Sequence, residues 1–341
     1  MPENTNRKII LNTLKFVGFL LLTVFVVYLV FKGIPMADFF HKLMEVNYFY
    51  VSFSAIAGLG AYYIRGLRWR LMLQPFNYNP KAINMYHSIA IGYFANMAIP
   101  RFGELVRCSS LKVTDDVPLD RSVGSVITER LSDLLVLGLL TLYLLFFHVG
   151  LISNFLNEKI FSPLGHSLYN QKYILTIVGS IVILAIVILL VFLFRSKKEN
   201  AIILKFKSMV TGFKDGLLSI YTMKKKGLFL TYTLLIWILY FLMAYVVFWA
   251  SPVTENLTVV DGLFILVAGS FGMVAPVQNG FGAYHWIVSM ALMALGLSRE
   301  DGLLYATLMH ETQVLVILVF GPISMYSVFF KTKRKKHEQS L

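Results

Sequence analysis

Four groups of ionisable or polar residues lie beside or within apolar segments, where each charge costs at least a few kcal/mol unless it is paired or wetted. The first group runs from Pro100 to Arg107. In a helix, Arg101, Glu104 and Arg107 would follow one another at i, i+3 spacing and place two guanidiniums around a carboxylate. Arginine forks bind phosphate or carboxylate, so this face suits an anionic headgroup, with Glu104 holding the arginines in place. The alternative is an interfacial helix whose ion pairs satisfy one another.

The second group lies at the end of an apolar run, between Thr128 and Asp133. Glu129 and Asp133 are at i, i+4 on one helix face, and Arg130 is turned away by about 100°. When two carboxylates lie close together, their repulsion raises the pKa of one of them. Such a carboxylate can carry a coupling proton, or the pair can bind a cation. The alternative, which does not exclude the first, is that one carboxylate pairs with an arginine of the first group and holds the bundle together.

The third group is His310 with Glu311, and the fourth is a glycine-rich segment that ends at His285. Gly280 and Gly282 allow backbone amides to approach a ligand, and a half-helix that begins after them would point its positive end at an anion. Both histidines have a side chain that changes charge near neutral pH in water. A lone histidine in a membrane is more often a hydrogen-bonded packing residue.

Two apolar segments that are each broken by glycine and proline would have to position these groups. They are Ile91–Arg107 and Ala268–Trp286, and they resemble each other: Gly92 and Gly269, for example, are 177 positions apart (269 − 92). Broken helices at corresponding places in two halves are typical of transport sites. Chance similarity between two such segments is the alternative. The residues expected to break the helices are Pro100, Gly103 and Pro276.

The composition predicts a membrane protein. Hydrophobic residues make up 57% and charged residues 14% of the chain, and the mean hydropathy is +0.69. Several apolar runs are long enough for a hydrocarbon core about 30 Å thick. We expect a single all-α polytopic domain with six full spans and two re-entrant helical hairpins, or eight nominal spans. The full spans are Ile10–Phe31, Tyr48–Ile64, Val123–Phe147, Tyr173–Phe194, Phe229–Ala250 and Leu303–Phe330, and the interrupted segments are Ala82–Leu111 and Val259–Gly296.

Basic residues predict the orientation, because lysine and arginine stay on the cytoplasmic side in short loops. The loop 195–226 and the tail 331–341 are strongly basic, and Arg7 and Lys8 precede the first span. Both termini are therefore expected in the cytoplasm. Three arginines lie near Trp69 in the sequence: Arg65, Arg68 and Arg70. The simplest interpretation is an anchor at the membrane interface. The alternative is that Arg65 or Arg68 reaches the site.

This orientation is consistent only if each broken segment enters and leaves the membrane on the same face. The first segment must do so from the cytoplasm and the second from outside. The blocks of about 48–147 and 229–330 then read as span, hairpin, span in opposite orientations, which is an inverted repeat. Glu129 and Glu311 occupy related positions in the last span of each block, 182 apart (311 − 129).

Other classes of function fit poorly. The net charge is +13, but the basic runs flank spans, where they orient the chain and contact anionic lipids, so nucleic acid is not an expected partner. The sequence His310-Glu-Thr-Gln-Val314 lacks the second histidine of a zinc protease helix. The chain also lacks a nucleotide-binding glycine loop, and it has a single cysteine, Cys108. We expect no enzyme, no catalytic residues, no cofactor and no metal.

Three segments carry a resemblance to a known family: Asn96–Arg107, Thr128–Leu135 and Ala275–His285. They resemble the flippase-like family found as the transmembrane domain of lysylphosphatidylglycerol synthases, over about Gly18 to Phe330. In fused members that domain is associated with moving a modified anionic lipid between leaflets, and a separate C-terminal domain makes the lipid. Because this chain ends at a basic tail, the synthase activity is not expected here. Matching residues are Asn96, Pro100, Arg101, Gly103, Glu104 and Arg107 in the first motif and Glu129, Arg130 and Asp133 in the second.

The chain departs from the family at His285, where many members have a glutamate after Gly-Gly-x-Gly-x-x. The resemblance therefore implies the same fold, whereas the lipid or the coupling ion can differ.

Together these features predict a bacterial-type inner membrane protein that translocates a lipid or lipid-linked substrate with an anionic headgroup. The expected substrate-binding residues are Asn96, Arg101, Glu104, Arg107, Arg130, Gly280, Gly282 and His285, and the expected proton- or ion-coupling residues are Glu129, Asp133, His310 and Glu311. The first alternative is a lipid-binding accessory subunit of an envelope lipid or glycan synthase, with that enzyme as partner. The second is an integral-membrane transferase. The lipid, the direction and the number of subunits stay open.

Overall fold

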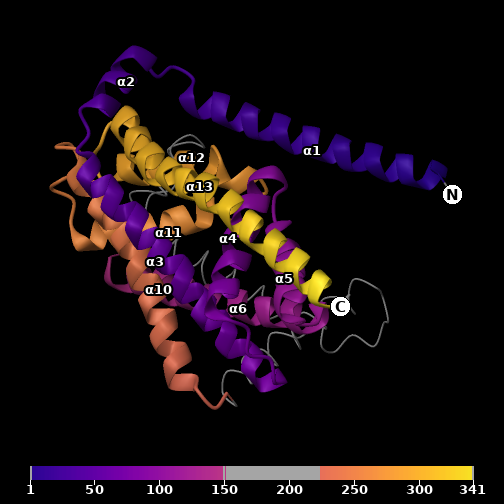
Figure 1. Ribbon diagram of the computed structural model, residues 1–341. Coiled ribbons are helices and arrows are strands. Elements are labelled where there is room, and N and C mark those ends of the chain that lie inside the picture. The colour runs from indigo at the N-terminus through magenta and orange to yellow at the C-terminus, as the bar shows by residue number, and fades with distance from the viewer. Residues whose placement is uncertain (1, 149, 151–222, 340–341) are drawn as a thin grey trace, which may run out of the picture. The chain divides into compact units, whose positions relative to one another are not determined.

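A computed structural model describes residues 2–148, 150 and 223–339, and every regular element in these ranges is a helix (Figure 1). The predicted all-α class is thus confirmed for the described residues. The predicted span Tyr173–Phe194 and most of the basic loop 195–226 lie outside them. The α-helices are α1 (Pro2–Phe31), α2 (Met36–Met44), α3 (Tyr48–Leu73), α4 (Ala82–Ala98), α5 (Gly103–Asp115), α6 (Leu119–Phe147), α10 (Lys226–Val246), α11 (Val259–Gly272), α12 (Ala283–Ala294) and α13 (Arg299–Gln339). Short 3₁₀ helices are η1 (Gln74–Phe76), η4 (Val247–Ala250) and η5 (Gln278–Gly280).

The chain divides into two compact units. One comprises Met1–Val126 and Gly227–Leu341, and the other comprises Ile127–Lys226. The helix α6 begins in the first unit and continues into the second. All of the hairpin and junction geometry below belongs to the first unit.

Three described helical segments are long and apolar enough to cross a membrane: Leu119–Phe147, Lys226–Ala250 and Arg299–Phe330. A fourth is possible if Val17–Phe31 and Met36–Met44, which are bent by 88°, form one broken span. These segments support an integral membrane protein. The full count of six spans stays a prediction.

The first predicted broken segment forms a helical hairpin of α4 and α5. Its open end is closed by Asp115, whose carboxylate accepts hydrogen bonds from the Asn84 side chain at 2.9 Å and from the backbone N–H of Lys81 at 3.1 Å. Near its tip, Gly92 lies so close to Gly103 that a Cβ on Gly92 would come within 2.9 Å of the Gly103 carbonyl oxygen. The bonds to Asp115 bring the start of α4 beside the end of α5, and the contact between the two glycines brings the helices together near the tip.

The second broken segment forms a hairpin of α11 and α12. A capping box formed by Thr258 and Asp261 begins α11, which is a common N-terminal signal. At the tip, a Cβ on Gly272 would lie 2.9 Å from the Cα of Tyr284. The connecting segment includes Asn279, with φ 47°, and two glycines with positive φ, which a continuous α-helix does not accommodate.

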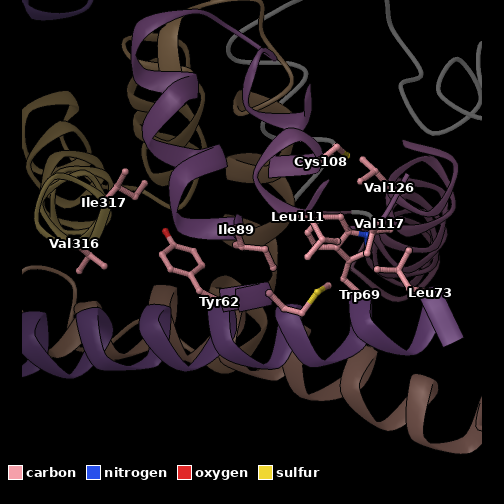
Figure 2. Close-up of a cluster of buried hydrophobic side chains, with 11 residues drawn as sticks. Tyr62, Trp69, Leu73, Ile89, Cys108, Leu111, Val117, Val126, Val316 and Ile317 are labelled. Atoms are coloured by element: carbon pink, nitrogen blue, oxygen red, sulfur yellow. The ribbon is translucent and has the colours of Figure 1, made fainter. Parts of the chain in front are cut away.

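The core of the first unit holds the first hairpin between α3 and α13. Its buried side chains come from α3, α4, α5, the connection between α5 and α6, the start of α6 and the middle of α13 (Figure 2). The members are Tyr62, Trp69, Leu73, Met85, Ile89, Cys108, Leu111, Val117, Val126, Val316 and Ile317. The helix α13 also packs against α12, where Gly302 lies against the backbone of Ser289. Both hairpins thus share α13 as a support.

Candidate functional site

The tips of the two hairpins meet and exchange hydrogen bonds. One guanidinium nitrogen of Arg101, in the first break, donates to the carbonyl oxygen of Val274 in the second at 2.8 Å. In return, the side-chain nitrogen Nε2 of Gln278, in the second break, donates to the carbonyl oxygen of Ala98, in the first break, at 2.9 Å. The ends of helices leave carbonyl groups without intrahelical partners. Each break therefore satisfies a carbonyl of the other, and we call these four residues the junction.

Arg101 occupies an unusual position in the junction. Its φ is 61°, a left-handed conformation that glycine adopts easily and arginine rarely. Its side chain is exposed, and no carboxylate of the described residues lies within ion-pair distance. Strained backbone at a helix break is often kept where a side chain has a task. The guanidinium donors of Arg101 beyond the one bound to Val274 therefore lie on an exposed side chain.

The arrangement differs from the predicted helix face with two arginines around Glu104. Arg107 does pair with Glu104, at 3.2 Å, and its guanidinium stacks over the Trp69 ring with the carbon 4.7 Å from the centroid. Arg101, however, precedes α5, because Pro100 and the positive φ of Arg101 delay the helix until Gly103. Only Glu104 and Arg107 therefore share the helix.

Asn96 holds the first break in shape. Its Oδ1 accepts a hydrogen bond from the backbone N–H of Gly103 at 2.7 Å, across the turn that contains Pro100. This bond supplies the first turn of α5 with a partner that its own N-cap residue, Phe102, does not provide. The side-chain oxygen of Asn96, a residue predicted to bind substrate, is thus engaged within the hairpin.

In the second hairpin, the structure brings two predicted groups together. Oε1 of Glu311 lies 3.2 Å from Nε2 of His285 on α12 and 3.1 Å from Nδ1 of His310 on α13. The other ring nitrogen of His310 faces the carbonyl oxygen of Asn279 at 2.9 Å. Both imidazoles are buried and the Glu311 side chain is 35% exposed.

The glycines of the second break serve its backbone path. Gly280 and Gly282 have φ values of 79° and 78°. A Cβ on Gly282 would lie 3.1 Å from the backbone nitrogen of Val27 on α1, so this glycine also permits the close approach of α1. The helix α12 begins directly after it, as predicted.

The interpretation of the α3 arginines as an interfacial anchor is wrong for two of them. Arg65 is 3% exposed, and Arg68 and Trp69 are fully buried, because α3 runs on through this segment against α4 and α10. Arg65 donates to the hydroxyls of Tyr93 on α4 and, at 3.1 Å, of Tyr240 on α10. Sequence reasoning missed these tyrosines and also missed Gln278, since no local pattern marks them.

Glu129, Arg130 and Asp133 belong to the second unit. On α6, Glu129 is buried, Arg130 is exposed and Asp133 is half-buried, in keeping with the expected helical spacing. That they join the same site as Arg101 stays a prediction.

Replacing Gln278 with leucine is expected to destabilise the protein, because the buried amide is lost and the Ala98 carbonyl loses its partner. An unsatisfied polar group costs about 1 to 3 kcal/mol. A fall in the melting temperature of the detergent-purified protein measures this effect. Gln74→Leu, in the short helix η1, is the control. Equal melting temperatures for the two variants would contradict the role of the Gln278 bond.

Over the residues that the structure describes, the fold and the junction define a helical membrane protein whose two broken-helix hairpins meet at their tips. The chain belongs to the family described as the lysylphosphatidylglycerol synthase TM region, which matches residues 15–321. This confirms the resemblance over most of the chain.

A curated protein is similar to part of the chain. The glycosyltransferase AglD of Haloferax volcanii is 28% identical over 135 residues, or 39% of this chain and 22% of that protein. The matched segment thus spans about a fifth of the relative's length. No solved structure matches the chain.

Proposed function

We propose that this protein moves a lipid or lipid-linked molecule with an anionic headgroup across the membrane. The observation that carries the proposal is Arg101, which is exposed, has no carboxylate partner among the described residues and is bound to a neutral carbonyl at the junction. A guanidinium in this state favours a phosphate or carboxylate oxygen, because an anionic acceptor adds charge attraction and can accept two parallel N–H···O bonds. Membership of the TM-region family supports a membrane function of this kind.

In the proposed mechanism, the junction is a gate. A headgroup replaces the Val274 carbonyl at Arg101, and this exchange removes one of the two hydrogen bonds between the hairpin tips. The tips then separate more easily around the bound headgroup. After the headgroup leaves, Arg101 again donates to the Val274 carbonyl oxygen, so the gate closes.

The mechanism uses the finer topology predicted from the sequence. We infer six full spans, with the hairpins re-entering from opposite faces as an inverted repeat, because that arrangement brings two broken helices to a shared site near the midplane. The lengths of α4 and α5, 17 and 13 residues, fall short of the about 20 residues that a full span needs, which favours re-entry over two short spans. Both termini would face the cytoplasm of a bacterial-type inner membrane.

The buried Glu129 and the half-buried Asp133 are the proposed groups for proton coupling. Their i, i+4 spacing places them on one face of α6. The sequence also suggested His310 and Glu311 for coupling. In the structure they form a separate group with His285, made of two imidazoles and one carboxylate.

The test is translocation in proteoliposomes. The purified chain is reconstituted with a fluorescent anionic phospholipid, and an impermeant quencher measures how much label becomes accessible. A zwitterionic analogue, a polyprenyl-phosphate probe and a pH gradient are tested in parallel. Protein-dependent loss of protected anionic label is expected. Full protection of every probe, with and without the gradient, would overturn the proposal.

A second candidate is favoured by the similarity to a glycosyltransferase. The chain would then bind a lipid-linked intermediate for an envelope lipid or glycan synthase without moving it, as an accessory subunit. Binding of the polyprenyl-phosphate probe without loss of its protection would favour this role. Chemical modification of that lipid by the purified chain and a sugar donor would instead indicate a transferase.

A further inference from the structure

The group formed by His285, His310 and Glu311 has the composition of a transition-metal site. One atom of each side chain lies within 4.8 Å of the others, and the two imidazole centroids are 4.9 Å apart. Two imidazoles and a carboxylate are the protein ligands of many zinc sites that keep an open position. The same set with open positions also suits other divalent first-row metals.

The distances match tetrahedral coordination. Ligands about 2.0 to 2.1 Å from a tetrahedral zinc lie about 3.3 Å from one another. In the structure the Glu311 oxygen is 3.2 Å from the His285 nitrogen and 3.1 Å from the His310 nitrogen. These two edges of the tetrahedron are therefore already formed, and an ion could be received with small side-chain movements.

The surroundings of His310 are also those of a metal ligand. A carbonyl oxygen can only accept a hydrogen bond, so a neutral His310 carries its proton on Nε2, facing Asn279, and its Nδ1 has a lone pair that can coordinate an ion. Such outer partners orient ligating histidines in known metal sites. The rings of Phe281 and Tyr284 flank His310, with centroids 4.9 and 5.2 Å away, and shield it from water.

We propose that His285, His310 and Glu311 bind a divalent transition-metal ion, with zinc as the best fit. The sequence lacked a second histidine beside His310-Glu311, and the fold supplies it from α12. The bound ion would pin α12 to α13 at the break of the second hairpin. Neutral imidazoles, one carboxylate and a 2+ ion carry a net charge of +1, and the half-exposed side of Glu311 leaves a position for an anionic oxygen or water.

Metal binding by the purified protein tests the proposal without a transport assay. The full chain is purified with a tag that contains no histidine, stripped with chelator and titrated with Zn²⁺ or Co²⁺, with the visible absorption of Co²⁺ as readout. Glu311→Gln and His310→Asn are compared with His87→Asn, whose side chain pairs with Ser324 on another part of α13. Size-exclusion profiles check that each variant folds.

One ion per chain is expected, with a tenfold or greater loss of affinity in Glu311→Gln and His310→Asn and no change in His87→Asn. X-ray absorption of the zinc-loaded protein should show two imidazoles at about 2.0 to 2.1 Å, which tests the site even if a variant fails to fold. No stoichiometric binding, or a spectrum without two imidazole ligands, would overturn the proposal and leave the three side chains as a hydrogen-bonded group.

Discussion

Replacing Arg101 with glutamine is expected to lower the protein-dependent translocation of an anionic lipid by about ten- to hundredfold. Glutamine retains a hydrogen-bond donor for the Val274 carbonyl but removes the charge that favours an anionic headgroup. A hydrogen bond to a charged group contributes about 1.5 to 3 kcal/mol, and about 1.4 kcal/mol is a factor of ten. The rate at which an impermeant quencher reaches labelled lipid in proteoliposomes measures the effect.

Arg101→Gly separates the role of the side chain from that of the backbone. Glycine adopts the left-handed φ of this position without the cost of about 1 to 2 kcal/mol that other residues bear, which offsets the loss of one hydrogen bond. This variant is expected to fold as well as the wild type and still fail to translocate. Arg121→Gln, which changes an exposed arginine beside Asp120, is the charge-matched control. Translocation by Arg101→Gly at the wild-type rate would remove Arg101 from the mechanism.

Replacing Gly103 with alanine is expected to disrupt the first hairpin. A Cβ at this position would overlap the carbonyl oxygen of Gly92 and lie 2.7 Å from Oδ1 of Asn96. Both atoms are held in place, one by the α4 backbone and the other by its hydrogen bond to Gly103. Overpacking costs about 1 to 3 kcal/mol and more where the backbone must move. We expect the largest fall in melting temperature among these variants, or no monodisperse protein in detergent.

Gly138→Ala is the matched control for this variant. Gly138 lies within α6, and a Cβ there would meet nothing within 4 Å. Alanine in a helix is favoured over glycine by about 1 kcal/mol, so this change should leave stability unchanged or raised. If Gly103→Ala proved as stable as Gly138→Ala, the close contact between α4 and α5 at Gly92 would be wrong.

The sequence alone determined the class of the protein and the position of its breaks. Hydropathy is a local property, and the apolar runs predicted at Val123–Phe147 and Leu303–Phe330 lie within the membrane-capable helices Leu119–Phe147 and Arg299–Phe330. Proline and positive-φ glycine act on their own backbone, so both helix interruptions fall in the predicted segments. The family resemblance was also confirmed, because its motif lies in continuous sequence.

The same local reasoning failed where a residue's environment comes from distant parts of the chain. Arg65 and Arg68 resembled an interfacial anchor, yet they are buried because α4 and α10 pack against them. Arg101 resembled a member of the α5 face, yet the turn after Pro100 turns it toward the other hairpin.

Only the tertiary structure decided which polar groups meet. The two hydrogen bonds of the junction join residues 173 and 180 positions apart, and His285 reaches Glu311 from a separate helix. Hydrogen bonds of this kind depend on two backbones arriving at the same place in the correct orientation, within about 3 Å. Composition and periodicity describe how each helix forms and which side of it is apolar, but they carry no information on the partner that a carbonyl or an imidazole finds across the fold.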